Sequence, residues 1–125
     1  MDYNWEYPQE SADWENLSLL LSETRVAFAA SGVPGLRTVT MAYYPDGRQE
    51  RLLARIRADV DLFHAMAYDA RGRHSTIDFA HKVVSQGTAH IPAPKLTLGL
   101  PFYARLAAAA PAAAACCELR GHPWR

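Results

Sequence analysis

Strand-like segments alternate with helix-like segments along this chain, and that order restricts the available folds most strongly. The strand-like segments are rich in β-branched and aromatic residues and each ends near a tyrosine; they span residues 2–7, 36–44, 60–68 and 95–103. Between them, apolar residues recur at helical spacing in residues 11–31, 49–58 and 76–86. Strands that alternate with helices predict an α/β fold with a parallel sheet covered by helices.

The strand–helix units have a mean length of about 30 residues, which is the size of one unit in a (β/α)8 TIM barrel of roughly 250 residues. Four such units cannot close an eight-stranded barrel. The chain therefore forms either an open α/β sheet or part of a larger barrel. Residues 106–125 are rich in alanine and interrupted by Pro111, and they predict no further strand.

Charge and composition argue against several classes of partner. Thirteen Lys and Arg balance thirteen Asp and Glu, so no net field attracts nucleic acid or an anionic membrane. The apolar run at 106–117 is too short to span a bilayer. The adjacent Cys116 and Cys117 and the five histidines have no metal-ligand spacing, and no glycine loop suits a phosphate. We expect no metal, cofactor, nucleic acid or membrane partner.

The first strand-like segment places polar groups on one face and aromatic rings on the other. Side chains alternate along a strand, so one face would carry Asp2, Asn4 and Glu6, and the other Tyr3, Trp5 and Tyr7. The aromatic face predicts burial, and we assign Trp5, Trp14 and Phe28 to the core. A polar face on a buried strand is costly unless it lines a wet cavity. Glu6, near the end of the segment, is the candidate acid of such a cavity.

Three motifs, in order, resemble the family 18 glycoside hydrolases, the chitinase family. The family signature Asp-x-x-Asp-x-Asp-x-Glu, followed by Tyr-Pro, is similar in its second half to residues 2–8. The family's Met-x-Tyr-Asp is similar to residues 66–69, and its Lys-Leu-x-Leu-Gly-Leu-Pro-Phe-Tyr-Gly-Arg is similar to residues 95–105 except at Ala104. A departure also falls inside the first motif, because Asn4 stands where the family usually has its third aspartate.

The resemblance implies that residues 1–105 are a partial catalytic domain, with strands four to seven of the barrel present and strands one to three and eight missing. Residues 106–125 would be a separate tail. The implied activity is hydrolysis of β-1,4-linked N-acetylglucosamine polymers with retention and without a cofactor. Chitin or its oligosaccharides would be the partner, and secretion is what the family implies for localisation.

The resemblance also implies a role for each site residue. Glu6 would protonate the leaving oxygen while the substrate's own N-acetyl carbonyl attacks the anomeric carbon. Asp2 would tune Glu6 from below, Asn4 would orient the acetamido group, and Tyr68 would donate its hydroxyl to the acetamido oxygen. The substrate-binding residues would be Met66, Asp69, Tyr103 and Arg105.

Other interpretations of these residues remain open. A glutamate near a strand end is ordinarily a surface carboxylate, and isolated tyrosines or methionines are more often packing residues. His64 would be a hydrogen-bonded core histidine, and His74 would lie in a loop leading to a helix capped by Ser75 or Thr76. The function could be that of a non-catalytic chitin-binding lectin on the same fold. The isolated chain could also be inactive, because both sheet edges would be exposed.

Overall fold

The computed structural model describes residues 1–33, 35 and 37–105. In chain order the elements are β1 (Asp2–Tyr3), α1 (Ser11–Ala30), β2 (Thr40–Tyr43), α2 (Gln49–Ile56), β3 (Leu62–Met66), α3 (Ile77–Thr88), the 3-10 helix η1 (Ala93–Lys95) and β4 (Leu96–Gly99). The predicted alternation of strands and helices is therefore confirmed. The predicted tail at 106–125 and its two cysteines lie outside the described residues.

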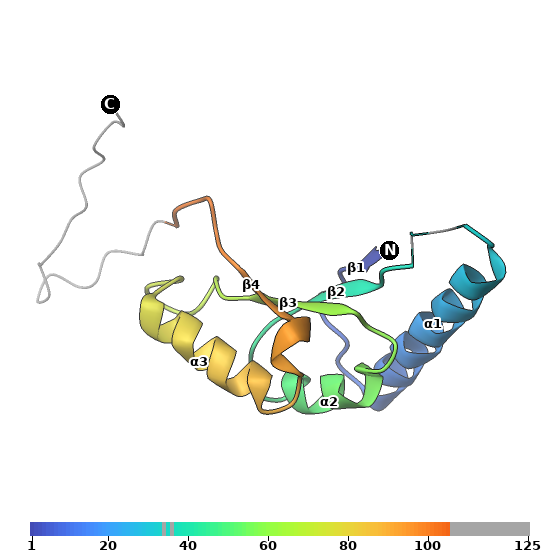
Figure 1. Cartoon of the computed structure of the whole chain (residues 1–125). Coiled ribbons are helices and arrows are strands. Elements are labelled where there is room, and N and C mark those ends of the chain that lie inside the picture. The colour runs from blue at the N-terminus through green and yellow to red at the C-terminus, as the bar shows by residue number, and fades with distance from the viewer. Residues whose placement is uncertain (34, 36, 106–125) are drawn as a thin grey trace, which may run out of the picture.

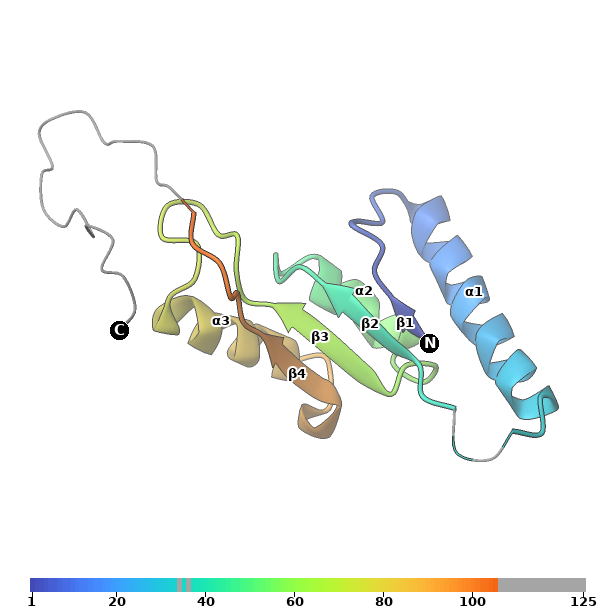
Figure 2. The same ribbon diagram turned by 90° about the horizontal axis from the view of Figure 1, so that it is seen from above.

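The four strands form one parallel sheet in the order β1-β2-β3-β4 (Figure 2). Helices α1, α2 and α3 lie on one face of the sheet (Figure 1). Among the described residues, no helix covers the other face. Because all strands run the same way, their carboxyl ends meet at one edge, where open α/β sheets and barrels place their ligands.

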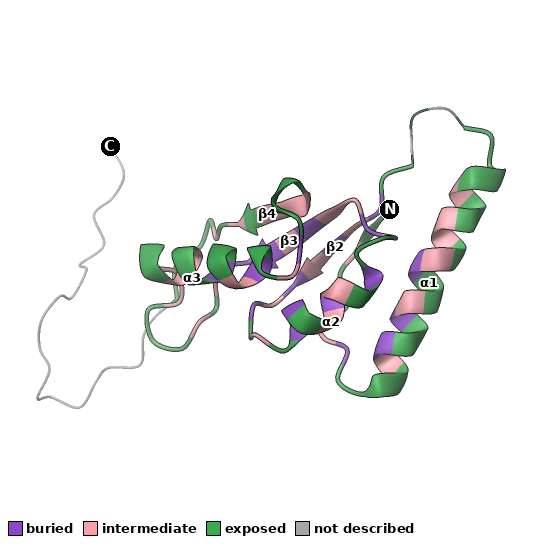
Figure 3. Cartoon of the chain, turned by 60° about the horizontal axis from the view of Figure 1, so that its bottom comes forward, coloured by how far each residue is buried: buried purple, intermediate pink, exposed green. Residues whose placement is uncertain are grey.

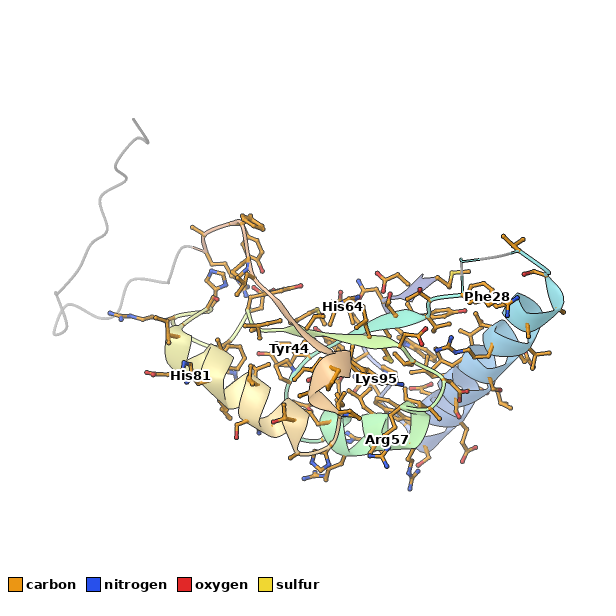
Figure 4. All side chains as sticks on the ribbon, in the orientation of Figure 1. Phe28, Tyr44, Arg57, His64, His81 and Lys95 are labelled. Carbon is orange, nitrogen blue, oxygen red and sulfur yellow. The ribbon has the colours of Figure 1, made fainter. Side chains whose placement is uncertain are left out.

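The core lies between the sheet and the helices (Figure 3). Trp14, Leu17 and Leu21 follow one another at helical spacing on the buried stripe of α1. Phe63 on β3 is fully buried, and Phe28 packs partly buried against the same cluster (Figure 4). The core assignments of Trp14 and Phe28 are confirmed.

The assignment of Trp5 to the core is wrong, since its side chain is 38% exposed. Regular alternation holds only while a strand is paired, and β1 pairs with β2 only through Asp2 and Tyr3. The predicted strand at residues 2–7 thus ends at Tyr3, and the residues after it do not continue the strand. The other strands are also shorter than predicted, at both ends.

Polar contacts close the amino-terminal edge of the sheet. The ammonium group of Lys95 donates to the carbonyls of Arg57, 2.7 Å away, and Val60, 2.6 Å away, which ties the end of α2 to η1, directly before β4 (Figure 4). Arg25 of α1 pairs with Asp61, 2.8 Å apart, just before β3. These contacts lie at the edge of the sheet opposite to the carboxyl ends of the strands.

Arg25 lowers the pKa of Asp61, and this makes a testable prediction about acid. The hydrogen bond from Arg25 is the largest cause, and the amide of Val39 adds to it. Because the folded pKa is below the unfolded value of about 3.9, the stabilisation is present above that pH and is lost as the pH falls through the folded pKa. We expect Arg25→Gln to raise the pKa of Asp61 in a carboxyl NMR titration. An unchanged midpoint would contradict the pairing.

Apolar side chains remain exposed on both flanks of the described fold. On the β1 side they lie on α1, where Leu19 is 59% and Val26 70% exposed. On the β4 side they line a hollow that includes Ile77, Val84 and Leu98. Both edges of the sheet therefore end in surfaces that a closed barrel would cover. None of the helices in the described part has the length and apolarity that a bilayer crossing needs.

Candidate active site

One polar side chain from each strand lies on the face of the sheet that the helices leave open. They are Asp2 from β1, Thr40 from β2, His64 from β3 and Thr97 from β4. Thr40 donates its hydroxyl to Asp2. His64, labelled in Figure 4, is hydrogen-bonded through Nδ1 to the hydroxyl of Thr97. His64 Nε2 lies 3.9 Å from Asp2 Oδ1. The prediction that His64 is hydrogen-bonded is confirmed, whereas its assignment to the core is wrong, because its side chain is 36% exposed. Asp2 is part of a row across the sheet.

Asn4 and Glu6 follow β1 and contact each other. The amide Nδ2 of Asn4 donates to Glu6 Oε1 over 3.0 Å, and both side chains are exposed. Two of the three polar residues of the first motif thus face one another beyond the strand end. Glu6 lies open to solvent among the described residues.

Tyr7 lies beside Glu6, so the predicted placement of Tyr7 on the opposite face is wrong. Burial first, and the neighbouring Glu6 carboxylate second, raise the pKa of Tyr7 to about 12. The ring of Tyr7 lies 6.0 Å from that of Tyr44, which follows β2. Because β1 ends at Tyr3, strand alternation no longer dictates where Tyr7 points.

Asp69 gathers the residues of the second and third motifs. Tyr103 donates its hydroxyl to Asp69 Oδ1 over 2.7 Å, and Arg105 Nη1 donates to the same oxygen over 2.9 Å. The hydrogen bond to Asp69 is the main cause that raises the pKa of Tyr103. The rings of Tyr68 and Tyr103 meet edge to face, with centroids 6.1 Å apart. The sequence-predicted residues after β3 and β4 therefore form one cluster.

Tyr44 joins the Glu6 region to this cluster. Its hydroxyl donates to the backbone oxygen of Asp69 over 3.4 Å, while its ring packs on Tyr7. Tyr7, the residue after Glu6, is therefore linked through Tyr44 to Asp69. These residues come from the ends of β1, β2 and β3, which lie at one edge of the sheet.

Gly99 lets Tyr68 lie directly on β4. A Cβ at this position would sit 3.3 Å from Tyr68 Cε1 and 3.2 Å from the oxygen of Ala65, tighter than ordinary contacts allow. Met66, at the end of β3, is 6% exposed and therefore has its side chain almost covered. The role of Met66 as a lining residue stays a prediction.

Sequence reasoning missed three residues of this region, namely Tyr7, Tyr44 and His74. Tyr44 carried a signal, because it ends a predicted strand as Tyr68 does, and parallel strand ends share an edge. The sequence gives no signal for the position of His74, because that position depends on how the loop after Asp69 folds. Residues 1–33, 35 and 37–105 contain no group of three or more His, Cys, Asp or Glu side chains that could hold a metal ion.

Comparison with known proteins relates the whole arrangement to one family. The sequence profile described as "Glycosyl hydrolases family 18" matches residues 1–116. Chitinase A1 of Niallia circulans is 30% identical over 84% of this chain and 20% of its own length. Chitinase 1 of Aphanocladium album is 26% identical over 84% of this chain and 31% of its own length.

A solved structure supports the same relationship. Class V chitinase from Nicotiana tobaccum, as a glutamate-to-glutamine mutant in complex with NAG4, superimposes with a TM-score of 0.61 and 26% identity. The match covers 81% of this chain and 35% of that one. The predicted partial (β/α)8 TIM barrel is confirmed. The chain spans about a third or less of the length of these relatives, and it belongs to the family 18 glycosyl hydrolases.

Proposed function

We propose that this chain carries strands four to seven of a chitinase-like catalytic barrel that hydrolyses β-1,4-linked N-acetylglucosamine polymers. The observation that carries the proposal is the contact of Tyr7, the residue after Glu6, with Tyr44, whose hydroxyl donates to the backbone oxygen of Asp69. It brings an acid, hydroxyl donors and aromatic faces to the ligand-binding edge of a parallel sheet. A sugar has both C–H faces and hydroxyl rims, which suit aromatic rings and hydrogen-bonding groups together. The NAG4 complex of the tobacco relative supports a ligand of this class.

Glu6 would act as general acid and then as general base. In a substrate-assisted reaction the acetamido carbonyl of the sugar supplies the nucleophile, so the protein needs one acid rather than two carboxylates. Tyr68 would donate its hydroxyl to that carbonyl, and Asp2 would tune Glu6 from the row below. Asp69, Tyr103, Arg105 and Met66 would bind the neighbouring sugar.

Asn4 makes a specific prediction about rate. Its amide N–H donates to Glu6 Oε1, but the amide carries no charge and so cannot offset the positive charge that develops on the sugar. A carboxylate at this position would instead repel ionised Glu6 and would also stabilise the positive charge on the developing oxazolinium ion. We expect Asn4→Asp to raise kcat by about tenfold or more in a complete barrel that contains these residues.

The control for this prediction is Asn4→Ala, which removes the amide without adding a charge. If the missing negative charge at position 4 limits the rate, Asn4→Ala should not raise kcat. A rate increase with alanine as large as that with aspartate would show that loss of the Asn4 amide alone explains the gain.

Asn4 also favours a second candidate, a chitin-binding lectin on the same fold, because it removes a charge that the reaction uses. Glu6 weighs against it, since lectins of this family characteristically lose the acid. The two are separated by incubating a complete barrel with a chromogenic chitobioside and, in parallel, measuring binding of a chitin oligosaccharide. Binding without release of the chromophore would decide for the lectin.

A further inference from the structure

His74 lies outside the three motifs, yet its contacts converge on Asp69. The backbone oxygen of His74 accepts the amide of Ala70 over 3.1 Å, which closes the loop between the two residues. The amide of Asp69 donates to His74 Nδ1 over 3.5 Å, and the same nitrogen lies 3.7 Å from Asp69 Oδ1. The His74 side chain is only 15% exposed, although it belongs to a surface loop.

The backbone of Asp69 needs such support. Its φ of 60° lies in the left-handed region, which a residue with a side chain adopts only where its surroundings hold it there. Because the amide of Asp69 donates to Nδ1, that nitrogen carries the lone pair and the neutral ring carries its proton on Nε2. The loop bond and the ring bond together hold Asp69 in this conformation.

The imidazole of His74 also packs against Tyr103, the hydrogen-bond partner of Asp69. It stacks on the ring of Tyr103, with centroids 5.3 Å apart and planes inclined by 24°. Tyr103 in turn donates its hydroxyl to Asp69 Oδ1, and Arg105 donates to the same oxygen. One side chain therefore contacts both the aspartate and the tyrosine of the predicted sugar-binding cluster.

We propose that His74 is a positioning residue that sets the orientation of Asp69 and Tyr103 for the neighbouring sugar, an inference that rests on the proposed function. Two substitutions separate its contacts. His74→Phe keeps the stack on Tyr103 and removes the acceptor for the Asp69 amide. His74→Asn keeps an acceptor near Nδ1 and removes the stack. Arg71→Ala, an exposed residue of the same loop, is the control.

The affinity for NAG4 is measured by calorimetry on a complete barrel that contains these residues. We expect His74→Phe to weaken binding by roughly tenfold, because the Asp69 amide loses its acceptor and the left-handed backbone of Asp69 loses that support. His74→Asn should recover most of that loss, and Arg71→Ala should change nothing. If His74 only filled space, His74→Phe, which keeps a ring, should bind NAG4 better than His74→Asn. The opposite order of affinities therefore points to the hydrogen bond. Unchanged affinity in His74→Phe would overturn the proposal.

A second measurement does not depend on sugar binding. The nitrogen NMR spectrum of a uniformly nitrogen-labelled complete barrel that contains these residues reports which ring nitrogen of neutral His74 is protonated and where the Asp69 amide signal lies. We expect a bare Nδ1, and a shift of the Asp69 amide signal in His74→Phe. A proton on Nδ1 of the neutral ring, with an unmoved Asp69 amide, would overturn the positioning role. If NAG4 binds no form of the barrel while these signals are as expected, the proposed function fails and the placement of Asp69 by His74 stands.

Discussion

Glu6→Gln is expected to abolish turnover of chitin oligosaccharides while leaving their binding almost intact. Glutamine has the shape of glutamate but carries no proton that it can give to a leaving oxygen. General acid catalysis contributes about 10²- to 10⁴-fold to a rate, and kcat should fall by that factor. The KM should move little, because Glu6 is exposed and its hydrogen bond is to Asn4, whereas the proposed sugar-binding cluster lies around Asp69.

The matched control is Glu10→Gln, which makes the same chemical change at an exposed glutamate before α1. It should leave kcat unchanged. Both variants are measured in a complete barrel, by release of a chromogenic leaving group and, separately, by oligosaccharide binding. Hydrolysis by Glu6→Gln at the wild-type rate would remove Glu6 from the mechanism, whereas loss of binding would place it in substrate recognition instead.

The fold was predictable because its signals are local. The α1 stripe of Trp14, Leu17 and Leu21 has helical spacing, and the buried strand β3 is a continuous apolar run apart from His64. Strand ends were less predictable. Residues 4–7 have the composition of a strand, but whether they pair depends on a neighbouring backbone, and β2 offers partners only to Asp2 and Tyr3. Trp5 was misplaced for that reason.

The site was predictable where a motif supplied it and not elsewhere. Tyr68, Asp69, Tyr103 and Arg105 were named from two separate motifs, and their meeting follows from the shared edge of parallel strands. The contact of Tyr7 with Tyr44 has no such basis, because both residues lie beyond the paired parts of their strands. Loop conformation, which places His74 under Asp69, depends on contacts between residues that no periodicity relates.

The isolated 125-residue chain is expected to self-associate, because it exposes apolar surface at both flanks of an unclosed sheet. Val84 is 43% exposed and Leu98 38% exposed, and both line the hollow on the outer side of α3 and β4. An exposed sheet edge beside apolar side chains offers another chain both hydrogen bonds and burial. Light scattering at increasing concentration should show growing particles, with turnover absent because half the barrel wall is missing.

Placing a charge on that surface should reverse the association. Val84→Lys and Leu98→Lys each remove apolar area and add a hydrated ammonium group, so the solubility limit should rise several-fold. His81→Lys is the matched control, because His81 lines the same hollow but is already polar (Figure 4). If added charge alone raised the solubility limit, this variant would raise it as much as the other two. A monodisperse wild-type monomer with a sharp, cooperative thermal transition would contradict this expectation. It would mean that four strand–helix units bury enough apolar surface to stand alone, and that the exposed flanks are ordinary surface.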